Sequence, residues 1–292
     1  MPAVRLDAEL VRRGLARSRR RAGELVAEGR VLVDGTPAHK PSQPVSEAVA
    51  VVVEAGPAPE YVSRAGYKLD GALDALAALV AVPPRVEGAM CLDAGASTGG
   101  FTQVLLARGA AHVLAVDVGH GQMAASVAAD PRVTVREGVN IRDLQAQDVE
   151  PSPTLVVADL SFISLTLVVP VLVGVSSPGA DLLLMVKPQF EVGRGRLGPG
   201  GVVTSPARRQ QAVLAVAEAV RSVGGAIHAV VPSPLPGPAG NHEYFLWATA
   251  PDGGRREVDL TGTLEDAVRT AVVDDRACQV RPPLRGVPRR LA

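Results

Sequence analysis

The feature that most constrains the fold is an alternation of short apolar segments with helical segments, from about Ser63 to residue 249. Such apolar runs are typical of buried strands, and helices between them indicate a parallel sheet covered on both faces. The loop of residues 232–240 is too short for a crossover helix, so we expect the last two strands to pair antiparallel. We therefore predict an α/β fold with a mostly parallel, seven-stranded sheet. Its strands are expected at residues 89–93, 113–117, 133–136, 154–159, 182–187, 226–231 and 243–249, and its helices at residues 101–108, 122–129, 165–173 and 206–223.

Composition limits the class of protein. The chain has 292 residues, enough for about two domains, and 47% of them are hydrophobic, which excludes a mainly disordered protein. Its longest apolar stretch, residues 165–175, is broken by Pro170 and Gly174 and is shorter than the roughly 20 residues of a membrane span. Two cysteines, Cys91 and Cys278, are too few for a disulfide framework or a thiolate cluster, and no metal is expected. The N-terminus lacks the apolar core of a signal peptide, so we expect a cytoplasmic protein.

The basic residues are almost all arginine. Only Lys40, Lys68 and Lys187 are lysines among 30 basic residues, and the formal net charge is +0. Arginine can serve wherever a positive charge is sufficient. The few lysines are therefore candidates for chemistry that needs a compact, titratable ammonium group.

Residues 1–56 are expected to form a small separate α+β domain. Helical spacing at residues 6–15 and 18–28 leads into a strand at residues 31–33. Six arginines and no acid lie between residues 12 and 21. After this domain we expect a linker at residues 57–64, a second domain at residues 65–275 and a basic, disordered tail at residues 276–292.

A glycine-rich turn follows the first predicted strand of the second domain. From Asp93 to Phe101 it has the spacing acid-x-Gly-x-x-x-Gly, which differs from the Gly-x-Gly-x-x-Gly that cradles a dinucleotide pyrophosphate. An acid there repels phosphate but suits S-adenosylmethionine (SAM), which brings an ammonium and a sulfonium group. The alternative is a strand–turn–helix with incidental glycines. Because ligands bind at the carboxyl ends of parallel strands, we assign cofactor binding to Asp93, Gly95, Ser97, Thr98, Gly99, Phe101, Asp117, Asn140 and Asp159.

Two lysines and two carboxylates are expected at this same edge of the sheet. Asp159 and Lys187 end the fourth and fifth strands, Glu243 begins the last strand, and Lys68 begins the helix before the first. Buried charges must be paired, so four such groups in one cleft favour a catalytic site. The alternative is two surface salt bridges, which are common and nearly neutral in energy.

The chemistry that suits these four residues is methyl transfer to a hydroxyl group. An alcohol is a poor nucleophile until its proton is removed, and burial beside another cation favours the neutral, basic form of a lysine. We assign the role of base to Lys187, an orienting role to Asp159 and Glu243, and substrate holding to Lys68. N-methylation typically uses an Asn-Pro-Pro-Tyr motif after the fourth strand, whereas this chain has Asp159-Leu160-Ser161-Phe162, which favours an oxygen acceptor.

The arginines of the first domain are candidates for RNA contacts. A charge run is more often a solvated face, but ahead of a methyltransferase-like domain we expect it to bind RNA phosphates. The domain has no aromatic residues for base stacking, so we expect it to read folded RNA by shape. The candidate contacts are Arg5, Arg12, Arg17, Arg19 and Arg20 of this domain, together with Arg64 at the end of the linker.

Several sequence blocks resemble the TlyA (hemolysin A) family of rRNA cytidine-2′-O-methyltransferases, which join an S4 RNA-binding domain to an FtsJ-like domain. Residues 5–35 are similar to the S4 domain, and the family's other blocks are matched at residues 93–101, 158–163, 186–193 and 240–245. One departure is Ala65, which stands where the family tends to have glycine after Ser63 and Arg64.

The resemblance implies a Rossmann-like, SAM-dependent methyltransferase whose Lys-Asp-Lys-Glu tetrad falls on Lys68, Asp159, Lys187 and Glu243. Ribosomal RNA in 30S or 50S subunits is the implied partner, with neither DNA nor a membrane involved and the protein a monomer. An influence on susceptibility to capreomycin-type antibiotics is also implied.

Three other functions agree less well with the sequence. A membrane-lytic hemolysin lacks support from any spanning segment or strongly amphipathic basic helix. A non-catalytic ribosome-binding protein is disfavoured because all four tetrad residue types and the glycine turn are present. A nicotinamide oxidoreductase is the weakest alternative, since the glycine spacing does not fit.

Overall fold

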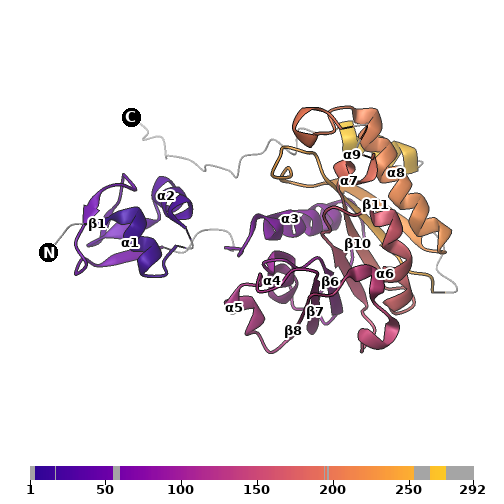
Figure 1. Cartoon of the computed structure of the whole chain (residues 1–292), viewed down its shortest axis with the longest axis horizontal. Coiled ribbons are helices and arrows are strands. Elements are labelled where there is room, and N and C mark those ends of the chain that lie inside the picture. The colour runs from indigo at the N-terminus through magenta and orange to yellow at the C-terminus, as the bar shows by residue number, and fades with distance from the viewer. Residues whose placement is uncertain are drawn as a thin grey trace. The chain divides into compact units, whose positions relative to one another are not determined.

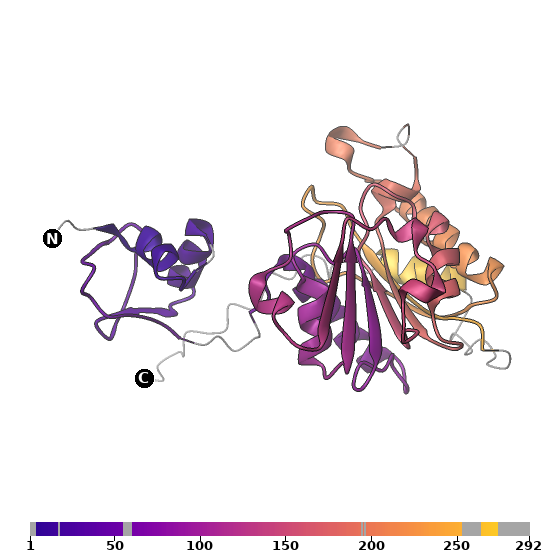
Figure 2. The same ribbon diagram turned by 60° about the horizontal axis from the view of Figure 1, so that its bottom comes forward.

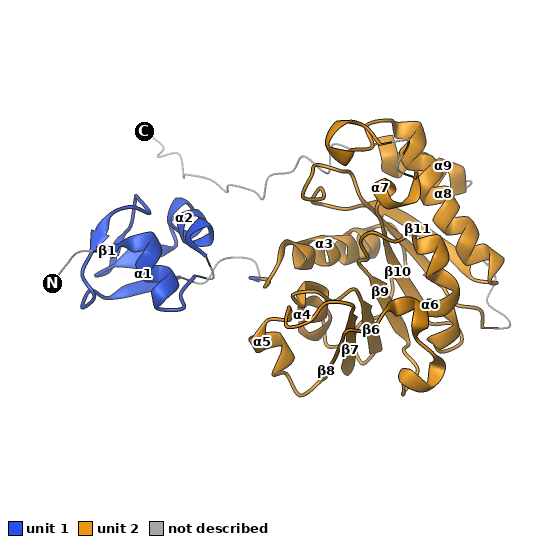
Figure 3. Cartoon of the chain, viewed as in Figure 1, with its two compact units in different colours: residues 1–60 blue, residues 61–292 orange. Residues whose placement is uncertain are grey.

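The computed structural model describes residues 4–16, 18–54, 60–193, 195, 197–252 and 264–273. The chain divides into two compact units, residues 1–60 and residues 61–292 (Figures 1 and 3). Arg17 and the predicted tail of residues 276–292 lie outside the described residues.

Unit 1 contains two helices and two small sheets. Its elements are β1 (Val4–Arg5), α1 (Leu6–Arg12), α2 (Arg19–Ala27), β2 (Val31–Val33), β3 (Thr36–Pro37), β4 (Pro44–Val45) and β5 (Val51–Val53). β2 lies between β3 and β5 and is antiparallel to both, and β1 pairs antiparallel with β4. Leu6, Leu10, Leu25 and Val31 are buried in the core of this unit. The predicted helix of residues 6–15 ends at Arg12, and Gly14 then takes a φ of 71° that a helix does not permit.

Unit 2 is built on a seven-stranded sheet. Its strands are β6 (Met90–Ala94), β7 (His112–Asp117), β8 (Val133–Glu137), β9 (Leu155–Ala158), β10 (Asp181–Val186), β11 (Ala226–Pro232) and β12 (Tyr244–Thr249). The strand order is β11-β12-β10-β9-β6-β7-β8, and β12 is antiparallel to both of its neighbours. The predicted α/β class, the mostly parallel sheet and the antiparallel final pair are confirmed.

Helices cover both faces of this sheet (Figure 2). They are α3 (Arg64–Leu79), α4 (Gly100–Ala107), α5 (Ala125–Ala128), α6 (Val169–Val175), α7 (Pro188–Glu191), α8 (Pro206–Ser222) and α9 (Leu264–Val273), with 3₁₀ turns η1 (Ile141–Asp143), η2 (Ala146–Asp148), η3 (Leu165–Leu167) and η5 (Pro199–Gly201). Val156 of β9 packs in the core layer that holds residues of α6, α8 and α9. Its neighbour Val157 packs in the layer that holds residues of α3 and α4. The fully apolar β9 therefore follows from burial on both sides.

Two predicted helices are shorter or interrupted in the structure. The segment predicted at residues 165–173 begins as η3 and becomes α6 only at Val169, where Pro170 occupies the first turn that proline tolerates. Of the helix predicted at residues 122–129, only α5 forms. α9 was not predicted, and it packs against α8 and β11. No helix among the described residues combines the length and apolar character needed to cross a membrane.

Unit 2 begins with a buried aromatic residue. Tyr61 is 2% exposed and packs against Gly66 in the first turn of α3, where a Cβ atom would lie 2.5 Å from Tyr61 Cγ. Tyr61 therefore belongs to the core of unit 2, although it lies within the predicted linker of residues 57–64. Lys68 is correspondingly in the second turn of α3, not at its beginning.

Candidate active site

The predicted catalytic residues meet at one edge of the sheet. Asp159 follows β9, Lys187 follows β10, and Glu243 precedes β12, whose antiparallel direction brings its start to the carboxyl ends of the parallel strands. A cavity of about 300 Å³ lies there. Its lining contains Lys68, Asp159, Lys187 and Glu243, together with Ser63, Arg64, Ala65, Gly95, Ala96, Ser97, Thr98, Phe101, Ser161, Pro236 and Pro238.

The four charged side chains form two short ion pairs. Lys68 Nζ lies 2.6 Å from Glu243 Oε2, and Lys187 Nζ lies 2.6 Å from Asp159 Oδ1. The side chains of all four are at most 16% exposed. The pairs are therefore not the surface salt bridges considered as the alternative. Charges this buried are costly unless they are paired, as these four are.

Lys187 has a second acceptor. Its Nζ donates to Ser161 Oγ at 2.9 Å, and its ammonium lies 5.9 Å from the centre of the Phe190 ring. Ser161 lines the cavity, although it was not among the predicted site residues. The available signal was its position two residues after Asp159, in the loop that leaves β9.

Glycine conformation brings the cofactor turn close to the catalytic loop. Gly95 has a φ of 89°, and a Cβ atom there would lie 2.7 Å from the backbone oxygen of Asp159. Gly99 also has a φ of 89° and directly precedes α4. Ser97, with a φ of 45°, donates its backbone N–H to Asp117 Oδ2 at 2.8 Å. The turn thus links the ends of β6, β7 and β9.

Five of the predicted cofactor residues line the cavity, namely Gly95, Ser97, Thr98, Phe101 and Asp159. The described residues of its lining do not include Asp93, Gly99, Asp117 or Asn140. Asp117 accepts the backbone N–H groups of Ser97 and Gly119, the latter at 2.7 Å, and so holds the loops around the cavity. Asn140 is exposed and caps η1 by accepting the N–H of Arg142 at 3.1 Å.

Asp93, at the end of β6, is fully buried. Its Oδ2 accepts the hydroxyl of Thr102 at 2.6 Å, and within the described part of the chain its Oδ1 has no hydrogen-bond partner. Burial raises the pKa of Asp93 to about 7, although the Thr102 hydrogen bond opposes this shift. The carboxyl group is therefore poised to change its protonation near neutral pH.

An exposed aromatic pair stands beside Ser161. Phe162 is 92% exposed with a φ of 66°, and its ring centre lies 5.2 Å from that of Phe190. Glu191 holds this loop, since it accepts the Leu165 N–H at 2.9 Å and the Ser164 hydroxyl. Burial raises the pKa of Glu191. The loop after β9 is thereby tied to α7.

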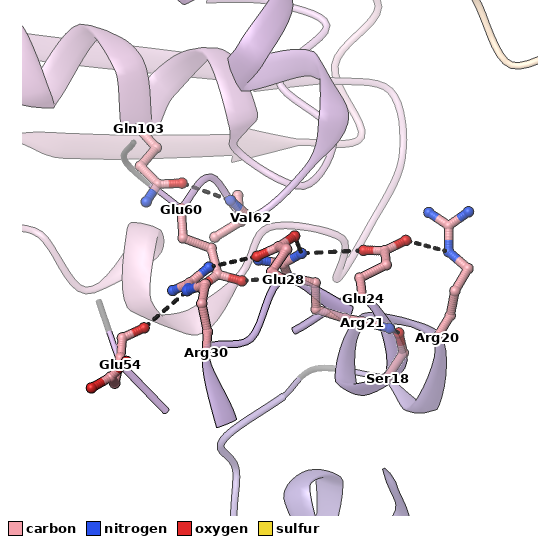
Figure 4. A network of polar contacts seen from close by, with 10 residues as sticks. All are labelled: Ser18, Arg20, Arg21, Glu24, Glu28, Arg30, Glu54, Glu60, Val62 and Gln103. Atoms are coloured by element: carbon pink, nitrogen blue, oxygen red, sulfur yellow. Dashed lines mark hydrogen bonds and ion pairs between the residues drawn. The ribbon is translucent and has the colours of Figure 1, made fainter. Parts of the chain in front are cut away.

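Four of the arginines predicted to contact RNA, all of them in the described part of unit 1, are paired with acids. Arg5 and Arg19 contact Asp7, Arg12 contacts Glu9, and Arg20 lies 3.5 Å from Glu24 (Figure 4). The pairs of Arg5, Arg12 and Arg20 are local, at spacings of two to four residues, whereas the fold brings Arg19 to Asp7, 12 residues away. In unit 2, Arg64 is exposed, lines the cavity and donates to the Pro236 oxygen at 3.4 Å.

Family models match both units. Residues 4–58 match the S4 domain, and residues 61–250 match the FtsJ-like methyltransferase. The chain is thus an FtsJ-like methyltransferase that carries an S4 domain.

Relatives that match nearly the whole chain show which family of FtsJ-like methyltransferases it belongs to. The chain is 54% identical over 269 residues to the 16S/23S rRNA (cytidine-2′-O)-methyltransferase TlyA of Mycobacterium tuberculosis, a match that covers 92% of this chain and 97% of the relative. It is 35% identical to YqxC of Bacillus subtilis, a candidate rRNA methyltransferase, over 91% of this chain and 94% of that protein. A solved structure of a candidate hemolysin from Streptococcus thermophilus is 31% identical, with a TM-score of 0.69 over 96% of this chain and 98% of that one. The chain belongs to the TlyA family.

Proposed function

We propose that the protein transfers a methyl group from SAM to the 2′-hydroxyl of a cytidine in 16S rRNA, 23S rRNA or both. The observation that carries this proposal is the pairing of two buried lysines with two carboxylates around one cavity, beside the glycine turn. The rRNA (cytidine-2′-O)-methyltransferase at 54% identity supports the choice of substrate. An rRNA substrate would place the reaction in the cytoplasm, where ribosomal subunits are found, and we propose that a monomer acts on them.

The residues around the cavity fit SAM. Gly95, Ser97 and Thr98 bring backbone to the cavity wall, and Asp159 is a carboxylate that lines it. The turn of residues 93–101 contains no basic side chain, which suits a cationic ligand without phosphate. We propose that these residues hold SAM, with Asp117 fixing the turn through Ser97. When bound, SAM supplies an electrophilic methyl group on a sulfonium.

Lys187 is the proposed general base. A neutral lysine amine has two N–H donors and one lone pair. Asp159 Oδ1 lies 2.6 Å from Nζ, and Ser161 accepts from Nζ at 2.9 Å. We propose that once Nζ has given up a proton, these two contacts direct its lone pair to the substrate hydroxyl. As the ribose oxygen gains the methyl group, its proton passes to Nζ.

Lys68 and Glu243 also line the cavity, as the second ion pair of the site. Each neutralises the other at 2.6 Å, so the pair can lie in the cavity without leaving an uncompensated charge. We propose that Glu243 accepts a hydrogen bond from the ribose and that Lys68 orients the Glu243 carboxylate through their contact. Alignment of the hydroxyl oxygen with the methyl group supplies much of the remaining acceleration.

The test is methylation of purified ribosomal subunits with labelled SAM, followed by mapping of 2′-O-methyl groups on both rRNAs. Subunits should come from cells that lack this enzyme. We expect label on a cytidine ribose with the wild-type protein and none with Lys187→Ala. Label on a base, or no incorporation into either subunit, would contradict the proposal.

A further inference from the structure

Two carboxylates of unit 1 are almost buried beneath exposed arginines. Asp7 and Glu9 belong to α1, and their side chains are 8% and 1% exposed. Asp7 accepts from Arg5 and Arg19, and Glu9 accepts from Arg12 and Arg13. Each acid thus holds two arginines.

The contacts of Arg5 and Arg12 leave one edge of each guanidinium for a second partner, whereas Arg13 donates its remaining N–H groups to backbone oxygens. Arg5 donates through Nε at 3.1 Å and Nη2 at 2.8 Å to the two oxygens of Asp7. Arg12 donates through Nε at 2.7 Å and Nη2 at 2.6 Å to the two oxygens of Glu9. In both cases the carboxylate takes the side edge of the guanidinium, and the end edge formed by Nη1 and Nη2 faces away from it. A guanidinium fork of this kind matches a phosphate group.

The acids lower the local charge without reversing it. Hydrogen bonds from arginine lower the pKa of both Asp7 and Glu9 to about 2, so both are ionised at neutral pH. Each acid with its two arginines therefore keeps a net charge of +1. The side chains of Arg5, Arg12 and Arg19 remain 53–59% exposed, which leaves them open to an anionic partner.

Other arginines of unit 1 are arranged differently. Arg21 and Arg30 are 13% and 16% exposed and lie between Glu28 and Glu60 in a closed network (Figure 4). Their N–H groups donate to other residues of the protein, and Arg30 also donates to the Glu54 backbone oxygen at 2.9 Å. Unit 1 thus separates internal arginines from arginines that are held rigidly at the surface.

We propose that Asp7 and Glu9 are positioning residues of an RNA-phosphate surface, which hold the guanidinium groups of Arg5, Arg12 and Arg19 ready for the rRNA backbone. The inference rests on the proposed rRNA substrate and extends it to two acids. Ordering a long side chain before binding removes an entropy cost that would otherwise reduce affinity. Asp7 and Glu9 would then strengthen binding to RNA, although their negative charges alone would be expected to weaken it.

The test compares two variants that each remove one negative charge. Asp7→Asn loses the ionised partner of Arg5 and Arg19. Glu47→Gln is the matched control, because Glu47 is exposed and its charge acts on Arg12, yet within the described part of the chain its carboxylate accepts no hydrogen bond from an arginine. With full-length protein and purified ribosomal subunits, we expect Asp7→Asn to bind about tenfold more weakly and Glu47→Gln to bind equally or more tightly. The plot of log Kd against log salt should be less steep for Asp7→Asn. The decrease in slope should correspond to the loss of about one phosphate contact.

A double-mutant cycle separates positioning from a merely structural role. In an Arg5→Ala/Arg19→Ala background, Asp7→Asn should no longer weaken binding, because neither guanidinium remains to be positioned. Thermal unfolding of each variant should show that unit 1 stays folded. A second cycle, in which Glu9→Gln is measured with and without Arg12→Ala, tests the second acid in the same way. Equal or tighter binding by Asp7→Asn, or the same loss in both backgrounds, would overturn the inference while leaving the proposed function intact. Failure of the wild-type protein to bind either subunit would overturn both.

Discussion

The absent side chain of Gly95 allows the cofactor turn to approach the backbone oxygen of Asp159, which a Cβ atom at Gly95 would meet at 2.7 Å. This contact joins the ends of β6 and β9. Any side chain at residue 95 would displace the loop that carries Asp159 and Ser161. The glycine turn thus affects both the proposed cofactor site and the proposed base.

Gly95→Ala is expected to impair both stability and SAM binding. The φ of 89° costs an L-residue roughly 1–2 kcal/mol, and the contact with Asp159 adds to this cost. The matched control is Gly88→Ala. Gly88 has a φ of 72°, and a Cβ atom there would meet nothing within 4 Å, so this variant is expected to lose only the backbone contribution. Denaturant unfolding and calorimetric SAM titration check this. Equal losses for the two variants would contradict the role of the close approach.

Lys187→Ala and Lys187→Arg are both expected to lower the rate of methyl transfer by about 100-fold or more. Alanine removes the base, and a guanidinium stays protonated and cannot accept the hydroxyl proton. SAM affinity should change little, because the assigned role concerns the substrate hydroxyl. Single-turnover assays with saturating ribosomal subunits, together with calorimetry, measure the two effects. A fully active Lys187→Arg variant would refute proton transfer to Nζ.

Ser161→Ala is expected to reduce kcat by about tenfold while leaving KM for both substrates nearly unchanged. The hydroxyl accepts from Lys187 Nζ at 2.9 Å and so directs the remaining lone pair. Ser161→Thr keeps this acceptor and should recover most of the rate, since residue 161 is exposed and has room for a methyl group. An equal loss for both variants would point to loop structure and not to the hydroxyl.

Asp93 is expected to make stability depend on pH near neutrality. Because burial raises its pKa from the ordinary 3.8 to about 7, the folded state holds the proton more tightly than the unfolded state. This contribution is fully present below about pH 4 and is lost as the pH rises through about 7, at up to about 1.4 kcal/mol per pH unit.

The measurement for Asp93 is the free energy of unfolding against pH, made without SAM. Asp93→Asn keeps the acceptor for Thr102 and should remove the decline between about pH 4 and 7. Asp130→Asn is the control, because hydrogen bonds from Arg132 lower the pKa of Asp130 to about 2, and its contribution is lost only as the pH falls from about 4. Parallel curves for wild type and Asp93→Asn would exclude the titration of Asp93 in this range.

The local pattern of apolar and charged residues was sufficient to predict much of the fold. Apolar segments located all seven strands of the sheet to within about two residues. The central strands are apolar because they are buried on both faces, whereas the edge strand β8 alternates exposed and half-buried residues. Charged residues at the ends of those runs then placed Asp159 and Lys187 at one edge, since parallel strands share their direction. α9 was not predicted, and α5 was overextended, since the backbone N–H of Gln122 in the predicted helix donates to the Glu137 carboxylate.

The sequence by itself determined the order of strands and helices, the glycine turn and the residue types available at the strand ends, since each depends on neighbours along the chain. Only the tertiary structure decided which charges pair. Lys68 and Glu243 are 175 positions apart, and they meet because β12 runs antiparallel beside β10. In unit 1, likewise, folding brings Arg19 to Asp7. Periodicity reports the local backbone, whereas an ion pair depends on the packing of elements far apart in the chain.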